Sequence, residues 1–180
     1  GTRCVATGFV GRDDLWLFEE FLERVGRGRI VMQLLIVRGR TRENITIMDP
    51  IFDTETHIRD EGFTVQPDDV RRIISKVGML AREETIMVFA GSMSPGVKLG
   101  DLRSMLHRCQ DEGAKIVIDT SGEAMKIIRA EPVWMIKLNA KELGALTGMK
   151  TETEEDVAVA GRTLLEESGG PAKYVIGTRG

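Results

Sequence analysis

The sequence predicts an α/β fold with a mainly parallel sheet. Short apolar runs rich in Val and Ile alternate with longer segments in which apolar residues recur every three or four positions. This alternation is typical of strands that are each followed by a helix. A region over 30–65 breaks the rhythm, because several strand-like runs follow one another there without a helical segment between them. We therefore expect one βα unit, a β-rich insertion, four further βα-type units and a final strand.

Composition indicates a single globular domain over 1–180. The chain is 42% hydrophobic and 29% charged, and its net charge of -3 gives no electrostatic reason to expect nucleic acid or an anionic membrane as partner. Cys4 and Cys109 lie far apart without metal-ligand spacing, so we expect reduced thiols in a cytoplasmic protein. No apolar run is long enough to predict a membrane span, and no leader is apparent. The chain has no initiating Met and stops in a strand and glycine turn, so both ends are expected to be cut.

The first βα unit comprises a strand over 3–11 and a helix from Asp13, with Asp13 or Asp14 as its capping residue. The helical spacing is carried by Leu15, Phe18, Leu22 and Val25. The turn between Gly8 and Gly11 has two interpretations: an ordinary strand-to-helix turn, or a cradle for phosphate.

The insertion over 30–65 is expected to contain strands over 30–37 and 41–49 and a weaker one over 54–58. Such consecutive strands suggest an antiparallel flap or an edge extension, which often covers a substrate. Arg38, Arg40 and Arg42 crowd one corner of this region. They either form a solvated loop face or recognise an anion, for which the guanidinium fork is well suited.

Regular units resume with a helix over 67–81, a strand over 85–90 and a small-residue turn over 91–97. In this turn Ser92 or Ser94 either hydrogen-bonds a ligand or belongs to an ordinary Gly/Pro turn. A helix over 99–112 and a strand over 114–118 follow, and Asp119 at the strand end is open to roles in catalysis, metal binding or helix capping.

The segment after Asp119 contains a short helix over 123–129, a strand over 132–136 and a helix that starts near Asn139. Asn139 and Glu142 are three residues apart, which is the spacing of a capping box. The same amide and carboxylate, with Lys137 beside them, also suit the organisation of Mg²⁺ and phosphate. A helix over 153–167 and a strand over 173–176 complete the pattern, before the glycines Gly177 and Gly180.

Four segments, taken together and in order, resemble the PfkB-type, ribokinase-like sugar kinases. Residues 91–97 resemble the SGSLPPG pattern of that family, residues 119–122 the DTSG pattern and residues 137–143 the KPNxxEL pattern. Residues 41–44 resemble the TRxN segment of its phosphosugar branch, which includes 1-phosphofructokinase and tagatose-6-phosphate kinase. The resemblance implies a ribokinase-like three-layer sandwich with a mainly parallel sheet and a β-rich lid insertion, incomplete at both ends.

The resemblance also implies a reaction, in which ATP and Mg²⁺ support phosphoryl transfer to a hydroxyl of a sugar phosphate. It assigns substrate binding to Arg42, Asn44 and Ser92, and nucleotide binding to Lys137, Asn139, Gly177 and Gly180. Asn139 and Glu142 would serve the metal. The family's catalytic base lies in a GAGD segment, which is expected beyond Gly180, so 1–180 is a partial kinase domain that we expect to be inactive alone. A homodimer is expected for the full-length protein.

Three alternatives remain open at this point. The first is a kinase for an unphosphorylated sugar or a nucleoside, which the pair Thr41 and Arg42 disfavours because it suits a substrate phosphate. The second is a non-catalytic sugar-phosphate-binding protein of the same fold. The third is an unrelated doubly wound α/β protein in which these motifs are only turns and caps.

Overall fold

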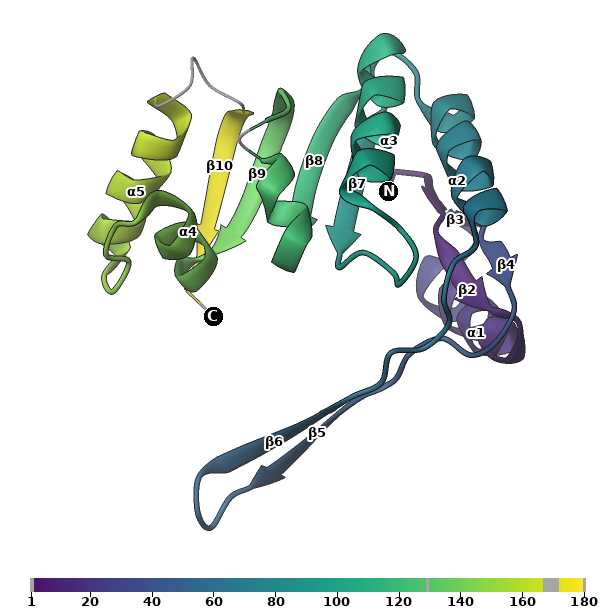
Figure 1. Ribbon diagram of the computed structural model, residues 1–180, viewed down its shortest axis with the longest axis horizontal. Helices are drawn as coiled ribbons and strands as arrows, with labels where there is room; N and C mark the ends of the chain where they lie inside the picture. The colour runs from purple at the N-terminus through teal and green to yellow at the C-terminus, as the bar shows by residue number, and fades with distance from the viewer. Residues whose placement is uncertain (1, 129, 167–171, 180) are drawn as a thin grey trace. The chain divides into compact units, whose positions relative to one another are not determined.

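Two compact units make up the chain in the computed structural model, which describes residues 2–128, 130–166 and 172–179. The first unit comprises Gly1–Ile73 and Ser94–Gly96, and the second comprises Ile74–Met93 and Val97–Gly180 (Figure 1). Each unit is described below by itself.

Two pairs of short parallel strands begin the first unit: β1 (Cys4–Ala6) with β3 (Ile30–Met32), and β2 (Phe9–Gly11) with β4 (Leu35–Val37). The sequence predicts one continuous strand in place of each consecutive pair, and this is wrong. Both strands are interrupted at the same level, where the Thr7 hydroxyl donates to the Gln33 carbonyl over 3.0 Å. Gly8 has a φ of 144° at this point, which few other residues adopt.

A single turn of 3₁₀ helix, η1 (Arg12–Asp14), leads into α1 (Leu15–Gly26). The expected helix is present, but the expected cap is not. Asp14 occupies the N-cap position of α1 and its side chain makes no capping hydrogen bond. Its carboxylate instead contacts a distant segment of the chain.

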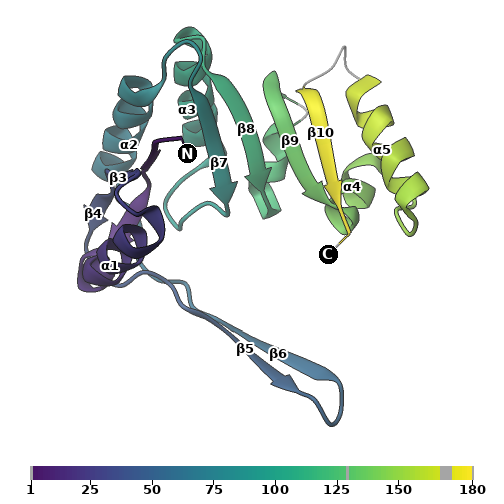
Figure 2. The ribbon, with the colours of Figure 1, turned by 180° about the vertical axis from the view of Figure 1, so that it is seen from behind.

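An antiparallel hairpin follows, formed by β5 (Asn44–Asp49) and β6 (Thr54–Arg59). It extends away from the helix and strands of its own unit (Figures 1 and 2). The predicted antiparallel flap is therefore confirmed for these two strands alone, because 30–37 pairs in parallel with the N-terminal strands. Helix α2 (Pro67–Leu80) begins in the first unit and ends in the second, and it buries Val70, Ile73 and Val77 at the predicted helical spacing.

The second unit is built on a parallel sheet in the order β10, β9, β8, β7. Its strands are β7 (Ile86–Gly91), β8 (Lys115–Thr120), β9 (Val133–Asn139) and β10 (Ala172–Thr178). One face carries α3 (Leu99–Asp111), η2 (Gly122–Ile127), α4 (Ala140–Thr147) and α5 (Glu154–Glu166), as Figures 1 and 2 show from opposite sides. Alternate strand residues such as Ile116, Ile118, Ile136 and Leu138 are buried, as expected for the covered side of a sheet.

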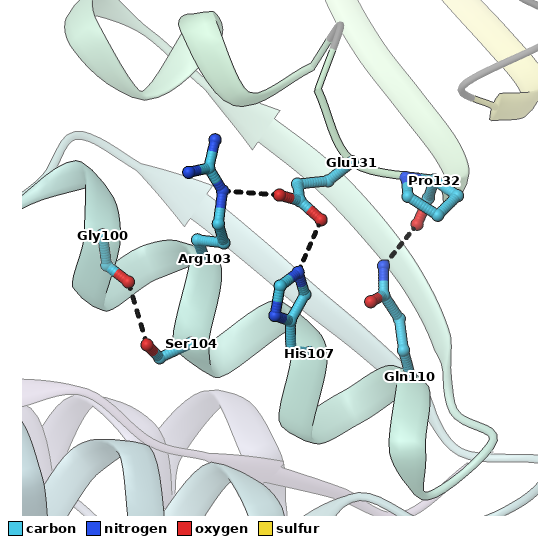
Figure 3. A network of polar contacts seen from close by, with 7 residues as sticks. All are labelled: Gly100, Arg103, Ser104, His107, Gln110, Glu131 and Pro132. Carbon is cyan, nitrogen blue, oxygen red and sulfur yellow. Dashed lines mark hydrogen bonds and ion pairs between the residues drawn. The ribbon is translucent and has the colours of Figure 1, made fainter.

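A buried carboxylate joins α3 to the segment before β9 (Figure 3). Glu131 accepts a hydrogen bond from Arg103 Nε over 2.6 Å, and its other oxygen lies 2.8 Å from His107 Nε2. Beside His107, the Gln110 side-chain amide donates to the Pro132 carbonyl over 2.8 Å. The start of β9 is thus held on α3 by side chains as well as by packing.

Both cysteines are free, as the sequence predicts. Cys4 is exposed, whereas Cys109 is one of the buried residues of α3, and burial raises the pKa of its thiol to about 11. Among the residues that the structure describes, no helix is long and apolar enough to cross a membrane.

Candidate active site

Polar and small residues gather at the carboxyl edge of the four-stranded sheet. All four strands are parallel, so their carboxyl ends meet at one edge, which is the usual location of ligand sites in open α/β sheets. The strand register places Gly91 beside Thr120 and Thr178 beside Asn139. Three of the four resemblance motifs therefore lie along this single edge.

Lys137 and Asp119 form an ion pair across β9 and β8. The Lys137 ammonium lies 3.0 Å from a carboxylate oxygen of Asp119, and both side chains are about half-exposed. Solvent screening leaves such a pair with about 0–1 kcal/mol of stabilisation, so its main effect is to fix the position of the ammonium group. The capping role considered for Asp119 is wrong, because the helix that follows has Ser121 at its N-cap position.

Asn139 and Glu142 form a reciprocal capping box at the start of α4. Asn139 Oδ1 accepts from the Glu142 amide over 2.8 Å, and Glu142 Oε2 accepts from the Asn139 amide over 2.9 Å. The predicted cap is confirmed. The Glu142 carboxylate thus lies where the amides of the first helical turn and the helix dipole favour a negative charge.

Within residues 2–128, 130–166 and 172–179, no group of three or more His, Cys, Asp or Glu side chains is placed to hold a metal ion. A Mg²⁺ ion bound with a nucleotide keeps most of its water ligands and needs only one or two protein carboxylates. The donor set of Asn139 and Glu142 therefore fits such an ion, and a dedicated all-protein cage is not required.

The turn after β7 is fixed by a hydrogen bond from the neighbouring strand. The Thr120 hydroxyl donates to the Gly91 carbonyl over 2.6 Å, and Gly91 adopts a φ of 85°, which favours glycine. This geometry turns the chain at Ser92, directly after the end of β7. Ser92 thus lies at the same sheet edge as Lys137 and Asn139.

Close packing of α5 on β10 makes Gly177 a position without room for a side chain. A Cβ atom at Gly177 would lie 2.4 Å from Val157 Cγ1. A hollow of about 450 Å³ opens beside this contact, lined by residues of α5 and β10 that include Gly161 and Val175. The other predicted nucleotide-binding glycine, Gly180, lies outside the described residues.

The two remaining predicted site residues, Arg42 and Asn44, belong to the first unit, whereas the sheet edge belongs to the second. Asn44 begins β5 and is paired with Arg59 of β6. Arg42 precedes this strand in a segment that contacts η1 and β2, since the Thr41 amide donates to Asp14 and the Gly11 amide donates to Thr41 Oγ1.

Asp14 and Gly11 are the residues of this region that sequence reasoning missed. Their contacts with Thr41 join positions 27 and 30 residues apart, and the nearby helix start offered a simpler role for Asp14. The residues that surround Asp14 and Gly11 in the sequence contain no signal of a contact with a residue so far along the chain.

Comparison with known proteins identifies the family. The model of the pfkB family carbohydrate kinases matches residues 56–180. The chain belongs to this family. The pfkB-family chain is 27% identical to the 1-phosphofructokinase of Rhodobacter capsulatus over 184 residues, which cover 98% of the chain and 57% of that relative. It spans about half the length of the curated relatives that it matches.

Solved structures confirm the ribokinase-like fold. Phosphofructokinase-2 from Escherichia coli, in complex with fructose-6-phosphate, matches the pfkB-family chain with a TM-score of 0.80 at 24% identity, covering 100% of this chain and 58% of that one. The ribokinase of Giardia lamblia matches with a TM-score of 0.67 at 15% identity, covering 99% and 54% respectively. At these identities the likeness establishes the fold alone.

Proposed function

We propose that this chain is the central part of a kinase that transfers the γ-phosphoryl group of ATP to a hydroxyl of a sugar phosphate. The observation that carries this proposal is the match to a relative named 1-phosphofructokinase over 98% of the chain, which includes all four motifs. The reaction would be of the 1-phosphofructokinase or the tagatose-6-phosphate kinase type. ATP and the sugar phosphate would be the small-molecule partners of a cytoplasmic enzyme.

The substrate phosphate would be bound by Arg42, Asn44 and Ser92. A guanidinium group matches the geometry of phosphate with two parallel hydrogen bonds, and amide and hydroxyl groups add neutral contacts. The resemblance to the phosphosugar branch over 41–44 supports this assignment.

The nucleotide would be bound at the carboxyl edge of the sheet by Lys137, Asn139, Gly177 and Gly180. The Asp119 carboxylate holds the Lys137 ammonium at this edge, where a phosphate oxygen would be its partner. Asn139 and Glu142 would hold Mg²⁺, which when bound neutralises charge on the transferred phosphoryl group. The cap leaves acceptor capacity on the Glu142 carboxylate, since an ionised carboxyl group has about four lone-pair sites.

No residue of this chain is assigned as the catalytic base. Asp119, an acidic group at the sheet edge, has its carboxylate paired with Lys137. We infer that the base lies beyond Gly180, in the GAGD segment of the family pattern, and that the 180-residue chain does not catalyse the reaction alone.

Turnover by the complete protein that contains this chain tests the proposal. Fructose 1-phosphate and tagatose 6-phosphate should be phosphorylated with a higher kcat/KM than fructose. A preference for fructose or a nucleoside would favour a kinase of an unphosphorylated substrate. Tight sugar-phosphate binding in calorimetry without ATP consumption would instead favour a non-catalytic binding protein of the same fold.

Two substitutions in the complete protein separate the assigned roles. Arg42→Ala should raise KM for the sugar phosphate about 10- to 100-fold, since a hydrogen bond to a charged group contributes about 1.5–3 kcal/mol. Glu142→Gln should mainly lower kcat and raise the Mg²⁺ concentration needed for half-maximal rate. Arg38→Ala is the matched control, because it removes an exposed arginine close in sequence without an assigned role. Unchanged kinetics in both Arg42→Ala and Glu142→Gln would contradict the proposed roles of Arg42 and Glu142 in binding.

A homodimer is the assembly that we propose for the full-length protein, with the hairpin of β5 and β6 as its contact. Ile45 and Ile58 are directly opposite each other on this hairpin, and each is 51% exposed. A two-stranded hairpin is only marginally stable alone in water, so cover by a second copy would stabilise it. Sedimentation velocity of Ile45→Lys against wild type tests this, and an unchanged sedimentation coefficient would contradict it.

A further inference from the structure

The segment that carries Arg42 is held against η1 and β2 by contacts with two residues. The Gly11 amide donates to Thr41 Oγ1 over 2.9 Å, and the Thr41 amide donates to Asp14 Oδ2 over 2.6 Å. A Cβ atom at Gly11 would lie 2.5 Å from both the Gly39 carbonyl oxygen and the Thr41 nitrogen. The backbone of 39–41 therefore lies directly on the end of β2.

The mostly buried carboxylate of Asp14 is the polar group that binds this segment. The Asp14 side chain is 13% exposed, and its second oxygen lies 3.5 Å from Arg40 Nε. The carboxylate sits at the N-cap position of α1 but forms no cap there. A charged acceptor gives a stronger hydrogen bond than a neutral one, so the bond to the Thr41 amide is well suited to hold that peptide group.

The other side of the segment is bounded by Gly62, which lies after β6. Gly62 has a φ of 68°, and a Cβ atom there would lie 2.6 Å from the Arg42 nitrogen and 2.8 Å from Arg42 Cβ. The Asp60 amide also donates to the Glu43 carbonyl over 3.2 Å. The backbone of Arg42 thus lies between two other stretches of chain, which fixes the direction in which its side chain leaves the backbone.

We propose that Asp14 is a positioning residue for recognition of the substrate phosphate. It acts through Thr41, because it holds the peptide group between Arg40 and Thr41, one residue before Arg42. This inference rests on the proposed function, in which Arg42 binds the phosphate. An arginine on an ordered backbone loses less conformational freedom when it binds, and that difference appears as affinity for the phosphorylated substrate.

Steady-state kinetics of the complete protein test the proposal. Asp14→Ala should raise KM for the sugar phosphate about tenfold, which corresponds to about 1.4 kcal/mol, and should leave KM for ATP within about twofold. Asp14→Asn keeps an oxygen that can accept from the Thr41 amide, so its KM should lie within about threefold of wild type. Thr41→Val, which removes the acceptor for Gly11, should also raise KM for the sugar phosphate selectively.

Asp69→Ala is the matched control. Asp69 lies in the same unit and its side chain is 19% exposed. Like Asp14, it accepts from one backbone amide, that of Gln66, and forms an ion pair with one arginine, Arg72. Its loss removes the same kinds of bond but does not touch the Arg42 segment. A general loss of stability would affect both variants, whereas only Asp14→Ala should change KM for the sugar phosphate.

Amide hydrogen exchange provides a readout that does not depend on activity. The Thr41 amide should exchange about tenfold faster in Asp14→Ala than in wild type and in Asp69→Ala, because its acceptor is gone. Wild-type exchange at Thr41 in Asp14→Ala, or an active Asp14→Ala enzyme with the KM of the Asp69→Ala control, would overturn the proposal. A wild-type protein that phosphorylates no sugar phosphate would instead contradict the proposed function. Faster exchange at Thr41 in Asp14→Ala would then still show that Asp14 holds the Thr41 amide, so that only the proposed function would be wrong.

Discussion

Replacing Glu131 by Ala should destabilise the second unit by about 2 kcal/mol. The carboxylate is 8% exposed, accepts from Arg103 over 2.6 Å and forms a second hydrogen bond with His107 Nε2 over 2.8 Å. Hydrogen bonds to a charged group contribute about 1.5–3 kcal/mol each, but both donors are about half-exposed and water replaces part of the loss. For a protein of this size, about 2 kcal/mol lowers Tm by about 4–8 °C, which thermal unfolding followed by circular dichroism would measure.

Glu123→Ala is the control for this experiment. Glu123 pairs with Lys126 over 2.8 Å, but its side chain is largely exposed, so water replaces the partner and Tm should stay within error of wild type. Equal Tm values for wild type and Glu131→Ala would refute the reasoning, because they would mean that the buried carboxylate contributes nothing to the attachment of β9 to α3. Arg103→Ala, which keeps the bond to His107, should give a smaller decrease than Glu131→Ala.

Three further outcomes are expected. Iodoacetamide at pH 8 should alkylate the exposed Cys4 rapidly and the buried Cys109 only after unfolding, which mass spectrometry would detect. Burial raises the pKa of Cys109 to about 11, so the stability contributed by its protonated thiol is present below about pH 9 and is lost as pH rises towards 11. Gly177→Ala should lower the free energy of unfolding in urea by about 1–3 kcal/mol, because its Cβ would clash with Val157. Adding Val157→Ala should recover part of this loss, and an unchanged stability of Gly177→Ala would contradict the clash. At the start of α5 the Asp156 carboxylate accepts from the Thr153 amide over 2.9 Å, and hydrogen bonds from the Thr153 backbone and side chain lower the pKa of Asp156 below its ordinary 3.8. The stabilisation from this contact is present above pH 3.8 and is lost as pH falls through the folded-state pKa. A carboxyl NMR titration would measure that pKa, and a value at or above 3.8 would contradict the contact.

Much of the fold follows from local periodicity. Helix α2 was predicted over 67–81 and runs over Pro67–Leu80, because its apolar residues and its N-terminal proline both lie in the sequence itself. The split strands at the N-terminus were not predictable in this way. At their interruption the Thr7 hydroxyl bonds to Gln33, 26 residues away, and a strand pattern contains no signal of such a partner.

The same distinction applies to the candidate site. Asn139 and Glu142 are three residues apart, so helix geometry alone brings them together and the capping box was predictable. The sequence places Lys137 and Asp119 each at a strand end, but their pairing depends on the order of strands in the sheet, which puts β8 beside β9. The contact of Asp14 with Thr41 is the least predictable of these, because the position of Asp14 at the start of α1 predicts a helix cap instead.

The capping box also bears on whether Glu142 serves a metal. The cap uses Oε2 of Glu142 and Oδ1 of Asn139, and both bonds come from the backbone of the first helical turn. These bonds order the carboxylate at the sheet edge without a ligand, so less conformational freedom would be lost on binding a phosphate-bound Mg²⁺. Such an ion needs only one or two protein oxygens, which the uncommitted lone pairs of the carboxylate would supply. The structural cap and the proposed metal role are therefore compatible, because the first supplies the preorganisation that the second requires.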